Sequence, residues 1–205
     1  MNEVVIVSTG AANIASVRAW LGRAGVASRV TSAAADVDRA GALVLPGVGA
    51  FGAAMTRLDA QGLAAPLHER VRVGRPTLCI CLGMQLLFDG SEESPGVAGL
   101  GVIGGVVRRL PAPVRTPQMG WNRVESTEGS NYAYFAHSYG VTSAPDGWDA
   151  AYATVGTGGA GPLRVVASIS RGAVVACQFH PELSSAYGVG VLSRWLARVP
   201  ETSPC

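Results

Sequence analysis

The sequence predicts a single-domain α/β fold. Apolar strands alternate with amphipathic helices in the first half of the chain, which is the pattern of a parallel sheet with helices on its faces. The second half changes to short strands separated by Gly, Pro, Ser and Asp turns, which indicates antiparallel strands added to that sheet or folded beside it. A chain of 205 residues is long enough to bury one sizeable core.

The first half supplies the parallel strands and their helices. The β-branched run "EVVIVS" favours a strand, and Ile14, Val17 and Leu21 recur at helical spacing before a closing glycine. Pro46 ends the apolar run "GALVLPG". The expected strands lie at 3–8, 27–31, 41–47 and 76–81, and the expected helices lie at 12–25, 51–63, 65–74 and from Gly83 onward.

The second half supplies six short strands and a closing helix. We expect the helix at 189–199 and the strands at 101–110, 119–126, 131–140, 150–155, 163–170 and 173–182. No internal repeat is evident. We therefore expect one domain over residues 1–200 and a flexible tail over 201–205.

Composition and charge exclude several classes of protein. With 48% hydrophobic and 15% charged residues the chain is an ordinary folded protein, and a net charge of +2 gives no electrostatic footprint for nucleic acid. The N-terminus lacks the features of a signal peptide, and no apolar stretch reaches the roughly 18 residues of a membrane span. We expect a cytoplasmic protein with free thiols, without a nucleic-acid or membrane partner.

Cys81 is the first candidate for chemistry. The strand "PTLCIC" turns directly into "LGMQLLF", so Cys81 is expected at the carboxyl edge of the sheet, where open α/β proteins bind ligands. A following helix N-terminus would favour a thiolate and offer N–H groups to an oxyanion. Cys79 lies two residues back in the strand and is expected to pack as a small apolar residue.

His180 is the candidate base. "ACQFHPELS" places Gln178, His180 and Glu182 at alternate positions ending a strand, so we expect the imidazole and the carboxylate on one face. A carboxylate behind an imidazole fixes its tautomer, which makes Cys81, His180 and Glu182 a possible triad. Of the other histidines, His68 is expected to be solvated on a surface helix, and His137 to be a structural, hydrogen-bonded residue.

The glycine-rich turn "LPGVGAFG" (45–52) is the candidate source of oxyanion donors. Glycines let backbone N–H groups approach a ligand, although the same turn also suits a plain strand-to-helix connection. A phosphate loop is disfavoured because the lysine and hydroxyl that follow the glycines in such loops are absent. No second cysteine or histidine pair completes a metal site, so we expect no metal and no cofactor.

The motifs "CLGMQ" and "QFHPE" together resemble those of the class I, triad-type glutamine amidotransferases. Within that family the chain is similar to the glutaminase subunits of imidazole glycerol phosphate synthases, through "TGAANIASV", "LPGVGAFGAAM", "SEES", "PQMGWNRV" and "YFAHSY". The resemblance implies a flavodoxin-like parallel sheet with helices on both faces and antiparallel strands in the C-terminal half. It implies hydrolysis of L-glutamine, with ammonia passed to a (β/α)8-barrel cyclase of histidine biosynthesis as the partner subunit.

The resemblance also implies roles for individual residues. Cys81 would be the nucleophile, His180 the acid and base, and Glu182 its orienting carboxylate. The oxyanion would be held by Leu82 and by the Val48 and Gly49 segment, and the amino-acid end of glutamine by Gln85, Glu93, Ser138 and Tyr139. Asn13, Met119 and Trp121 would lie toward the cyclase, although Met119 and Trp121 equally suit the core.

The chain departs from the family pattern at three positions. Cys79 stands where glycine is usual, Ser8 where aspartate is usual, and Leu183 where a basic residue is usual. The alternatives are a neighbouring amidotransferase, such as the glutaminase of pyridoxal phosphate synthesis or a γ-glutamyl hydrolase, and a non-catalytic regulatory subunit of the same fold. "PQMGWN" and "PGVGAFG" disfavour the first, and joint retention of Cys81, His180 and Glu182 disfavours the second.

Overall fold

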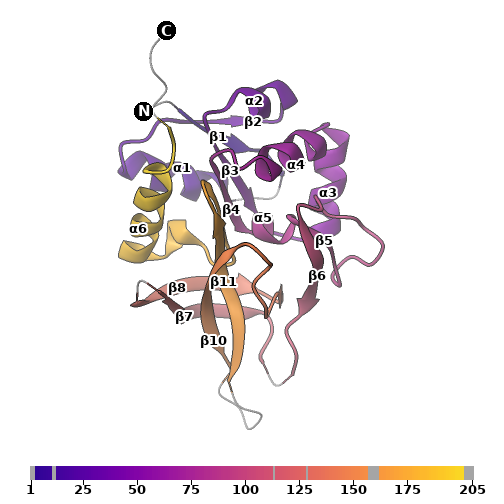
Figure 1. Cartoon of the computed structure of the whole chain (residues 1–205), viewed down its shortest axis with the longest axis vertical. Coiled ribbons are helices and arrows are strands. Elements are labelled where there is room, and N and C mark those ends of the chain that lie inside the picture. Colours follow the sequence, from indigo (N-terminus) through magenta and orange to yellow (C-terminus); the bar gives the residue numbers. More distant parts are fainter. Residues whose placement is uncertain (1–2, 11–12, 113, 128, 157–161, 201–205) are drawn as a thin grey trace.

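A nine-stranded mixed sheet forms the centre of the molecule (Figure 1). The computed structural model describes residues 3–10, 13–112, 114–127, 129–156 and 162–200, so the predicted tail lies outside the described residues. The strand order is β2-β1-β3-β4-β12-β11-β10-β7-β8. The predicted α/β class is confirmed, and no helix among the described residues is long and apolar enough to cross a membrane.

The first half of the chain forms the parallel part of this sheet. Each strand is a short β-branched or apolar run, and β1, β3 and β4 are buried along their whole length, as expected for strands covered on both faces. The strands are β1 (Val4–Val7), β2 (Ser28–Thr31), β3 (Ala42–Gly47) and β4 (Thr77–Cys81), and β12 (Val174–Cys177) joins parallel to β4. The carboxyl ends of β3, β4 and β12 therefore lie at one edge.

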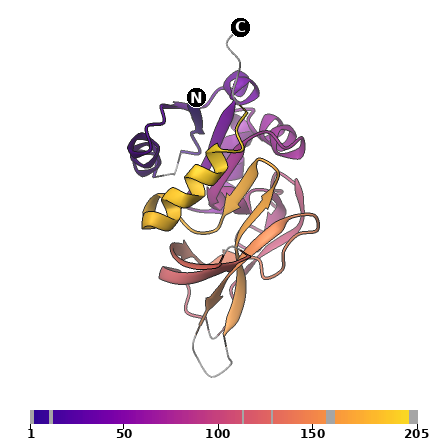
Figure 2. The ribbon, with the colours of Figure 1, turned by 60° about the vertical axis from the view of Figure 1, so that its left-hand side comes forward.

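Helices cover both faces of the parallel part (Figures 1 and 2). Apolar side chains of α1 (Ile14–Arg23) and α6 (Ser185–Leu196) pack in one core cluster. Those of α2 (Ala34–Arg39), α3 (Phe51–Ala60) and α4 (Ala64–Arg72) pack in the other. The three-layer arrangement leaves the carboxyl edge of the strands for a site.

The second half extends the sheet with antiparallel strands. Their burial has a period of two, with alternate residues exposed in β7 and alternate residues buried in β10, which fits strands that have one solvated face. They are β7 (Gln118–Ser126), β8 (Gly129–His137), β10 (Asp149–Val155) and β11 (Leu163–Arg171). β7 and β8 form a hairpin in which Met119 pairs with Ala136 and Trp121 with Tyr134.

A three-stranded sheet lies beside the main one. It consists of β5 (Phe88–Ser91), β6 (Ile103–Arg109) and β9 (Tyr139–Gly140), in the order β5-β6-β9. The hydrophobic residues Phe88, Ile103 and Val107 join the same core cluster as α3 and α4. This sheet fixes the segment that carries Ser138 and Tyr139.

Several predicted elements differ from the observed ones. The helix expected from Gly83 onward is only α5 (Leu82–Gln85), because the carbonyls of Leu86, Leu87 and Phe88 accept hydrogen bonds from residues 100–103 and not from a following helical turn. The predicted strand 173–182 ends at Cys177, since Pro181 begins the short 3₁₀ helix η1 (Pro181–Leu183). α6 begins four residues before the predicted start, and α2 and β5 were not predicted.

Candidate active site

Cys81 sits on a strained turn between β4 and α5. Its backbone has φ 52° and ψ −108°, a combination that costs free energy for a residue with a side chain and is typical of functional sites. Residues two apart in a strand share a face, but this turn separates the two cysteines: Cys79 packs in the core cluster of α3 and Cys81 in that of α1. The predicted elbow therefore forms although Cys79 replaces the usual glycine.

Cys79 is a buried core residue. Its side chain has no exposed surface, and burial raises the pKa of its thiol to about 12. A thiol in that state is almost fully protonated near neutral pH and reacts slowly. Cys79 therefore has the surroundings expected of a packing residue.

Two glycines make room for the turn at Cys81. A Cβ on Gly83 would lie 2.1 Å from the carbonyl oxygen of Leu45, and a Cβ on Gly47 would lie 2.8 Å from the Cβ of Leu82. The end of β3 and the start of α5 thus pack with backbone against backbone. This close approach brings the glycine-rich segment after β3 next to Cys81.

His180 and Glu182 form a buried pair. The Nδ1–H of His180 donates to Oε1 of Glu182 over 2.9 Å, and their side chains are 6% and 2% exposed. The predicted proximity of His180 and Glu182 is correct, but the predicted reason, alternate positions at the end of one strand, is wrong. The pair meets through the 3₁₀ turn that Pro181 begins, because β12 has already ended at Cys177.

The surroundings of His180 favour its protonated form. Burial lowers the pKa of His180, but hydrogen bonding to Cys81 and Glu182 and the negative charge of both groups outweigh burial and raise that pKa to about 10. With Nδ1 held by Glu182, Nε2 is the nitrogen available to the reacting groups. The imidazole is thus suited to carry a proton beside the Cys81 sulfur.

A cavity of about 370 Å³ opens in front of Cys81 and His180. Its size fits a small amino acid. Every residue predicted to bind glutamine or its oxyanion lines it, although these residues come from four separate segments. The lining residues are Val48, Gly49, Cys81, Leu82, Gln85, Glu93, Pro117, Ala136, His137, Ser138, Tyr139 and His180.

The candidate oxyanion and substrate groups differ in how they are held. Leu82 is the first residue of α5, where a backbone N–H has no partner within the helix. Gln85 donates its Nε2 to the Tyr139 carbonyl over 2.9 Å, so that side chain is fixed by the β8–β9 segment. Oε2 of Glu93 accepts from the backbone N–H of Phe51 over 2.7 Å, which ties Glu93 to the first turn of α3.

His137 also lines the cavity, and sequence reasoning assigned it only a structural role. Its Nδ1–H donates to the Tyr139 carbonyl over 2.9 Å, so Nε2 is the acceptor nitrogen of a neutral ring. Nε2 is buried and has no hydrogen-bond partner within the described structure. The position of His137, two residues before Tyr139 in "HSY", was the available signal, but only the fold shows that its ring lines the site.

Other predicted residues lie outside the cavity. Met119 and Trp121 are 64% and 51% exposed, which excludes the core alternative for both. Asn13 caps α1 by accepting from the N–H of Ser16. His68 is not simply solvated, since it is half-buried and donates to the Leu100 carbonyl over 2.7 Å.

Within the described ranges no group of three or more His, Cys, Asp or Glu could hold a metal ion.

Comparison with known proteins identifies the family. The model of the family "Glutamine amidotransferase class-I" matches residues 6–196, nearly the whole described chain. This chain belongs to the class I glutamine amidotransferases.

Curated relatives of this amidotransferase carry a narrower name. "Imidazole glycerol phosphate synthase subunit HisH" of Deinococcus radiodurans is 45% identical over 204 residues, which cover 94% of this chain and 92% of that protein. The HisH subunit of Nostoc punctiforme is 39% identical over the full length of both. "Imidazole glycerol phosphate synthase hisHF, chloroplastic" of Arabidopsis thaliana is 39% identical over 97% of this chain but only 35% of its own length.

Solved structures share the amidotransferase fold at low identity. One described as "Crystal structure of glutamine amidotransferase" superposes with a TM-score of 0.75 at 19% identity and covers 96% of this chain and 98% of that one. "Structure of PurLQS from Thermotoga maritima" gives a TM-score of 0.69 at 14% identity, over 97% of this chain and 99% of that one. These likenesses establish the fold. The arrangement at Cys81 is known from the structure of this chain and not from those proteins.

Proposed function

We propose that this amidotransferase is the glutaminase subunit of imidazole glycerol phosphate synthase in histidine biosynthesis. It hydrolyses L-glutamine to L-glutamate and ammonia and passes the ammonia to a cyclase. The observation that carries the proposal is the arrangement of Cys81 on its strained turn, beside the His180–Glu182 pair, at the cavity lined by the candidate substrate groups. The HisH names of relatives over nearly full length support the subunit assignment.

In the first half-reaction Cys81 is the nucleophile. Its sulfur forms a bond to the side-chain carbonyl carbon of glutamine, and the carbonyl oxygen becomes an oxyanion. We assign the N–H of Leu82 and N–H groups of the Val48–Gly49 segment as its hydrogen-bond donors, because all three residues line the cavity beside Cys81. Protonated His180 then gives its proton to the leaving nitrogen, the C–N bond breaks, and ammonia and a thioester result.

In the second half-reaction water releases the product. His180, now neutral, takes a proton from a water molecule, which attacks the thioester carbon. The C–S bond breaks, and glutamate and the free Cys81 sulfur are formed. Glu182 holds the tautomer of His180 through both steps, and the raised pKa of His180 supports the role of imidazolium as proton donor.

Substrate recognition falls to the remaining polar groups that line the cavity. Gln85 uses its Nε2 on the Tyr139 carbonyl, so its Oε1 is the atom we assign to the α-ammonium group of glutamine. Glu93 would add its negative charge, and the backbone at Ser138 and Tyr139 would bind the α-carboxylate. The cavity of about 370 Å³ suits a free amino acid better than a peptide or a nucleotide.

The partner we propose is a (β/α)8-barrel cyclase subunit. The match to the Arabidopsis synthase covers only 35% of that protein, so most of that synthase has no counterpart in the present chain. Met119 and Trp121, on one face of β7, present exposed apolar side chains that suit a docking surface. Asn13 is also exposed, but its capping of α1 accounts for it without a partner.

Replacement of Cys81 tests the function. Cys81→Ala or Cys81→Ser should abolish glutamate release from glutamine, by about a thousandfold or more, because no other cysteine among the described residues lines the cavity. In a complex with the cyclase and its nucleotide substrate, ammonia-dependent synthesis of imidazole glycerol phosphate should be unchanged. Both rates are measured by coupled assays of glutamate and of the cyclised product.

Cys79→Gly is the matched control, since it alters a cysteine two residues away that does not line the cavity. It should retain most of the glutaminase activity. Loss of turnover in Cys79→Gly with retention in Cys81→Ala would reverse the assigned roles. If the cyclase gave no stimulation of glutamate release from the unaltered protein, the subunit assignment would be wrong and a different amidotransferase would be indicated.

A further inference from the structure

Gln178 contacts the sulfur of Cys81 and has no role in the mechanism above. Its side chain is 1% exposed, and its Nε2 lies 3.8 Å from Sγ of Cys81, within the range of a hydrogen bond to sulfur. Its Oε1 accepts from Nε2 of Gln85 over 3.1 Å. The two glutamines therefore form a buried chain that ends on the nucleophile.

The direction of this chain is fixed by one carbonyl group. A carbonyl oxygen only accepts hydrogen bonds, so Gln85 must turn its NH₂ group toward the Tyr139 carbonyl. That same NH₂ group also faces Gln178, whose side-chain oxygen must therefore accept the hydrogen bond. The NH₂ group of Gln178 is then the end that points at Cys81. If the Gln178 amide were reversed, its NH₂ group would face the NH₂ group of Gln85, and neither could accept a hydrogen bond.

We propose that Gln178 is a catalytic contact of the Cys81 sulfur in addition to His180, because its amide N–H stabilises the thiolate. Gln85 is a positioning residue, which orients this amide from the Tyr139 carbonyl. The inference rests on the proposed function, in which Cys81 is the nucleophile. It gives Gln85 a second task besides substrate binding. It also gives the first residue of "QFHPE" a chemical reason.

The other groups at the sulfur explain why such a donor is useful. As a thiol, Cys81 donates to the Ala136 carbonyl over 3.9 Å, and that carbonyl opposes a negative charge on the sulfur. When the proton moves to His180, the imidazolium supplies one stabilising charge. The Gln178 N–H adds a neutral donor, so the thiolate has a second stabilising partner both before it attacks glutamine and when the C–S bond breaks.

The test measures the ionisation of Cys81 without glutamine and without the cyclase. The rate of iodoacetamide alkylation of Cys81 is followed by peptide mass from pH 5 to 10 in the isolated subunit. Gln178→Met keeps the length of the side chain and removes the donor. We expect its alkylation midpoint to rise by about one pH unit, which lowers the alkylation rate about tenfold at pH values below both midpoints.

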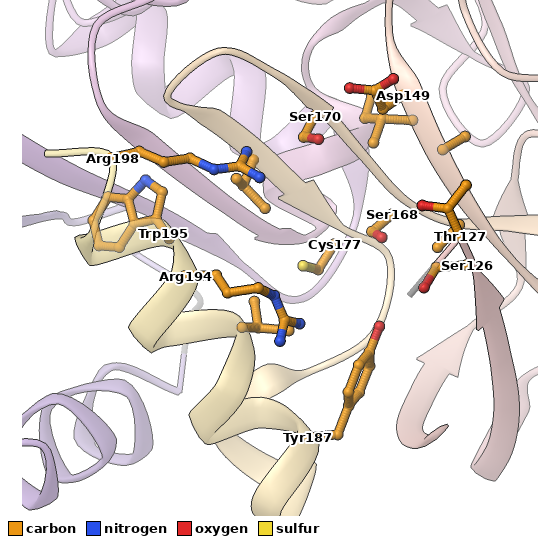
Figure 3. Close-up of a pocket in the computed structure, with 15 residues that line it drawn as sticks. Ser126, Thr127, Asp149, Ser168, Ser170, Cys177, Tyr187, Arg194, Trp195 and Arg198 are labelled. Carbon is orange, nitrogen blue, oxygen red and sulfur yellow. The ribbon is translucent and has the colours of Figure 1, made fainter. Parts of the chain in front are cut away.

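Gln85→Met tests the orienting step, since it leaves the Gln178 donor intact but free to turn away. We expect a smaller rise of about half a pH unit, so that the rate at pH values below both midpoints falls about threefold. Cys177→Ala is the matched control, because Cys177 precedes Gln178 in the chain but lines a different pocket, beside α6 (Figure 3). That variant should give the midpoint of the unaltered protein.

The outcomes separate this inference from the proposed function. Equal midpoints for Gln178→Met and the unaltered protein, with both folded by circular dichroism, overturn the role of Gln178. If Gln178→Met does not fold, Gln178→Leu takes its place, and an unchanged midpoint there overturns the role of Gln178. An unchanged midpoint in Gln85→Met overturns the orienting role of Gln85. Retained glutaminase activity in Cys81→Ala would instead refute the proposed function, whatever the alkylation profiles are.

Discussion

At the scale of single residues, backbone conformation decides which cysteine lies at the cavity. Cys79 and Cys81 have the same chemistry and lie two positions apart, yet the positive φ of Cys81 sends the two side chains to different core clusters. Burial then raises the pKa of Cys79 to about 12, while Cys81 meets His180 and Gln178 at the cavity. Sequence chemistry pointed to Cys81, and the strained turn gives the physical reason.

His137 should make the folded protein sensitive to acid. Burial lowers the pKa of His137 to about 4, and the hydrogen bond to the Tyr139 carbonyl opposes this only in part. An unfolded histidine titrates near 6.5, so between these values the unfolded chain binds a proton that the folded protein does not. Stability contributed by this group is present above about pH 6.5 and is lost as the pH falls toward 4, by about 3 kcal/mol at most.

Urea unfolding of the unaltered protein and of His137→Gln at pH 7.5 and pH 4.5 measures this effect. Other groups titrate in both proteins and cancel in the comparison. The variant should lose about 2 kcal/mol less stability between the two pH values. An equal loss in both proteins would mean that the neutral, buried state of His137 is not the cause.

At the scale of elements, the 3₁₀ turn η1 positions the acid–base pair. It is fastened to β8 because the N–H of His180 donates to the Tyr134 carbonyl and the N–H of Tyr134 donates to Oγ of Ser184. The next helix, α6, packs against it at Gly188, where a Cβ would lie 1.8 Å from the carbonyl oxygen of Pro181. The sequence predicted a strand here, since Pro181 alone does not show that a turn brings Glu182 back to His180.

Gly188→Ala should therefore damage the site from a distance. The added methyl group pushes α6 and η1 apart, so the 2.9 Å contact of His180 with Glu182 should be lost or lengthened. We expect glutaminase activity to fall at least tenfold and the free energy of unfolding to fall by about 1–3 kcal/mol. Thermal unfolding and glutamate release measure the two effects.

Gly190→Ala, two residues further along α6, is the matched control. The nearest atom to a Cβ there is Nη1 of Arg194 at 3.1 Å, the far end of a flexible side chain. Alanine favours a helix over glycine by up to about 1 kcal/mol, so Gly190→Ala should be neutral or stabilising and should keep its activity. Equal damage by both substitutions would contradict the packing explanation.

At the scale of the whole molecule, the site lies where the parallel and antiparallel halves of the sheet meet. Cys81 and the glycine-rich segment come from the ends of β4 and β3, while the cavity is closed by Ala136–Tyr139 from the second half. The hairpin that carries Ala136 also carries Met119 and Trp121, exposed beside the site. A partner docked on this hairpin would touch the strand that lines the cavity.

Trp121→Ala should weaken the complex with the proposed cyclase partner. Trp121 is 51% exposed, and large aromatic side chains contribute disproportionately to interfaces, so we expect the Kd to rise about thirtyfold. Val73→Ala is the control, because Val73 is also 51% exposed but lies before β4, at the end of the strand opposite to Cys81. Titration calorimetry with the purified cyclase measures both, and equal affinities for the two variants would exclude Trp121 from the docking surface.

The sequence by itself determined the α/β class and the alternation of strands and helices, and it singled out Cys81, His180 and Glu182 as the candidate triad. These features are readable because hydrophobic periodicity and a few chemically distinctive residues are local properties of the chain. Only the tertiary structure decided that α5 is a single turn, that Glu93 caps α3, that the ring of His137 is buried at the cavity, and that the Gln178 amide faces Cys81. Each of these depends on hydrogen bonds or packing between residues far apart in the chain. Hydrophobic periodicity carries no information about which of those residues come into contact.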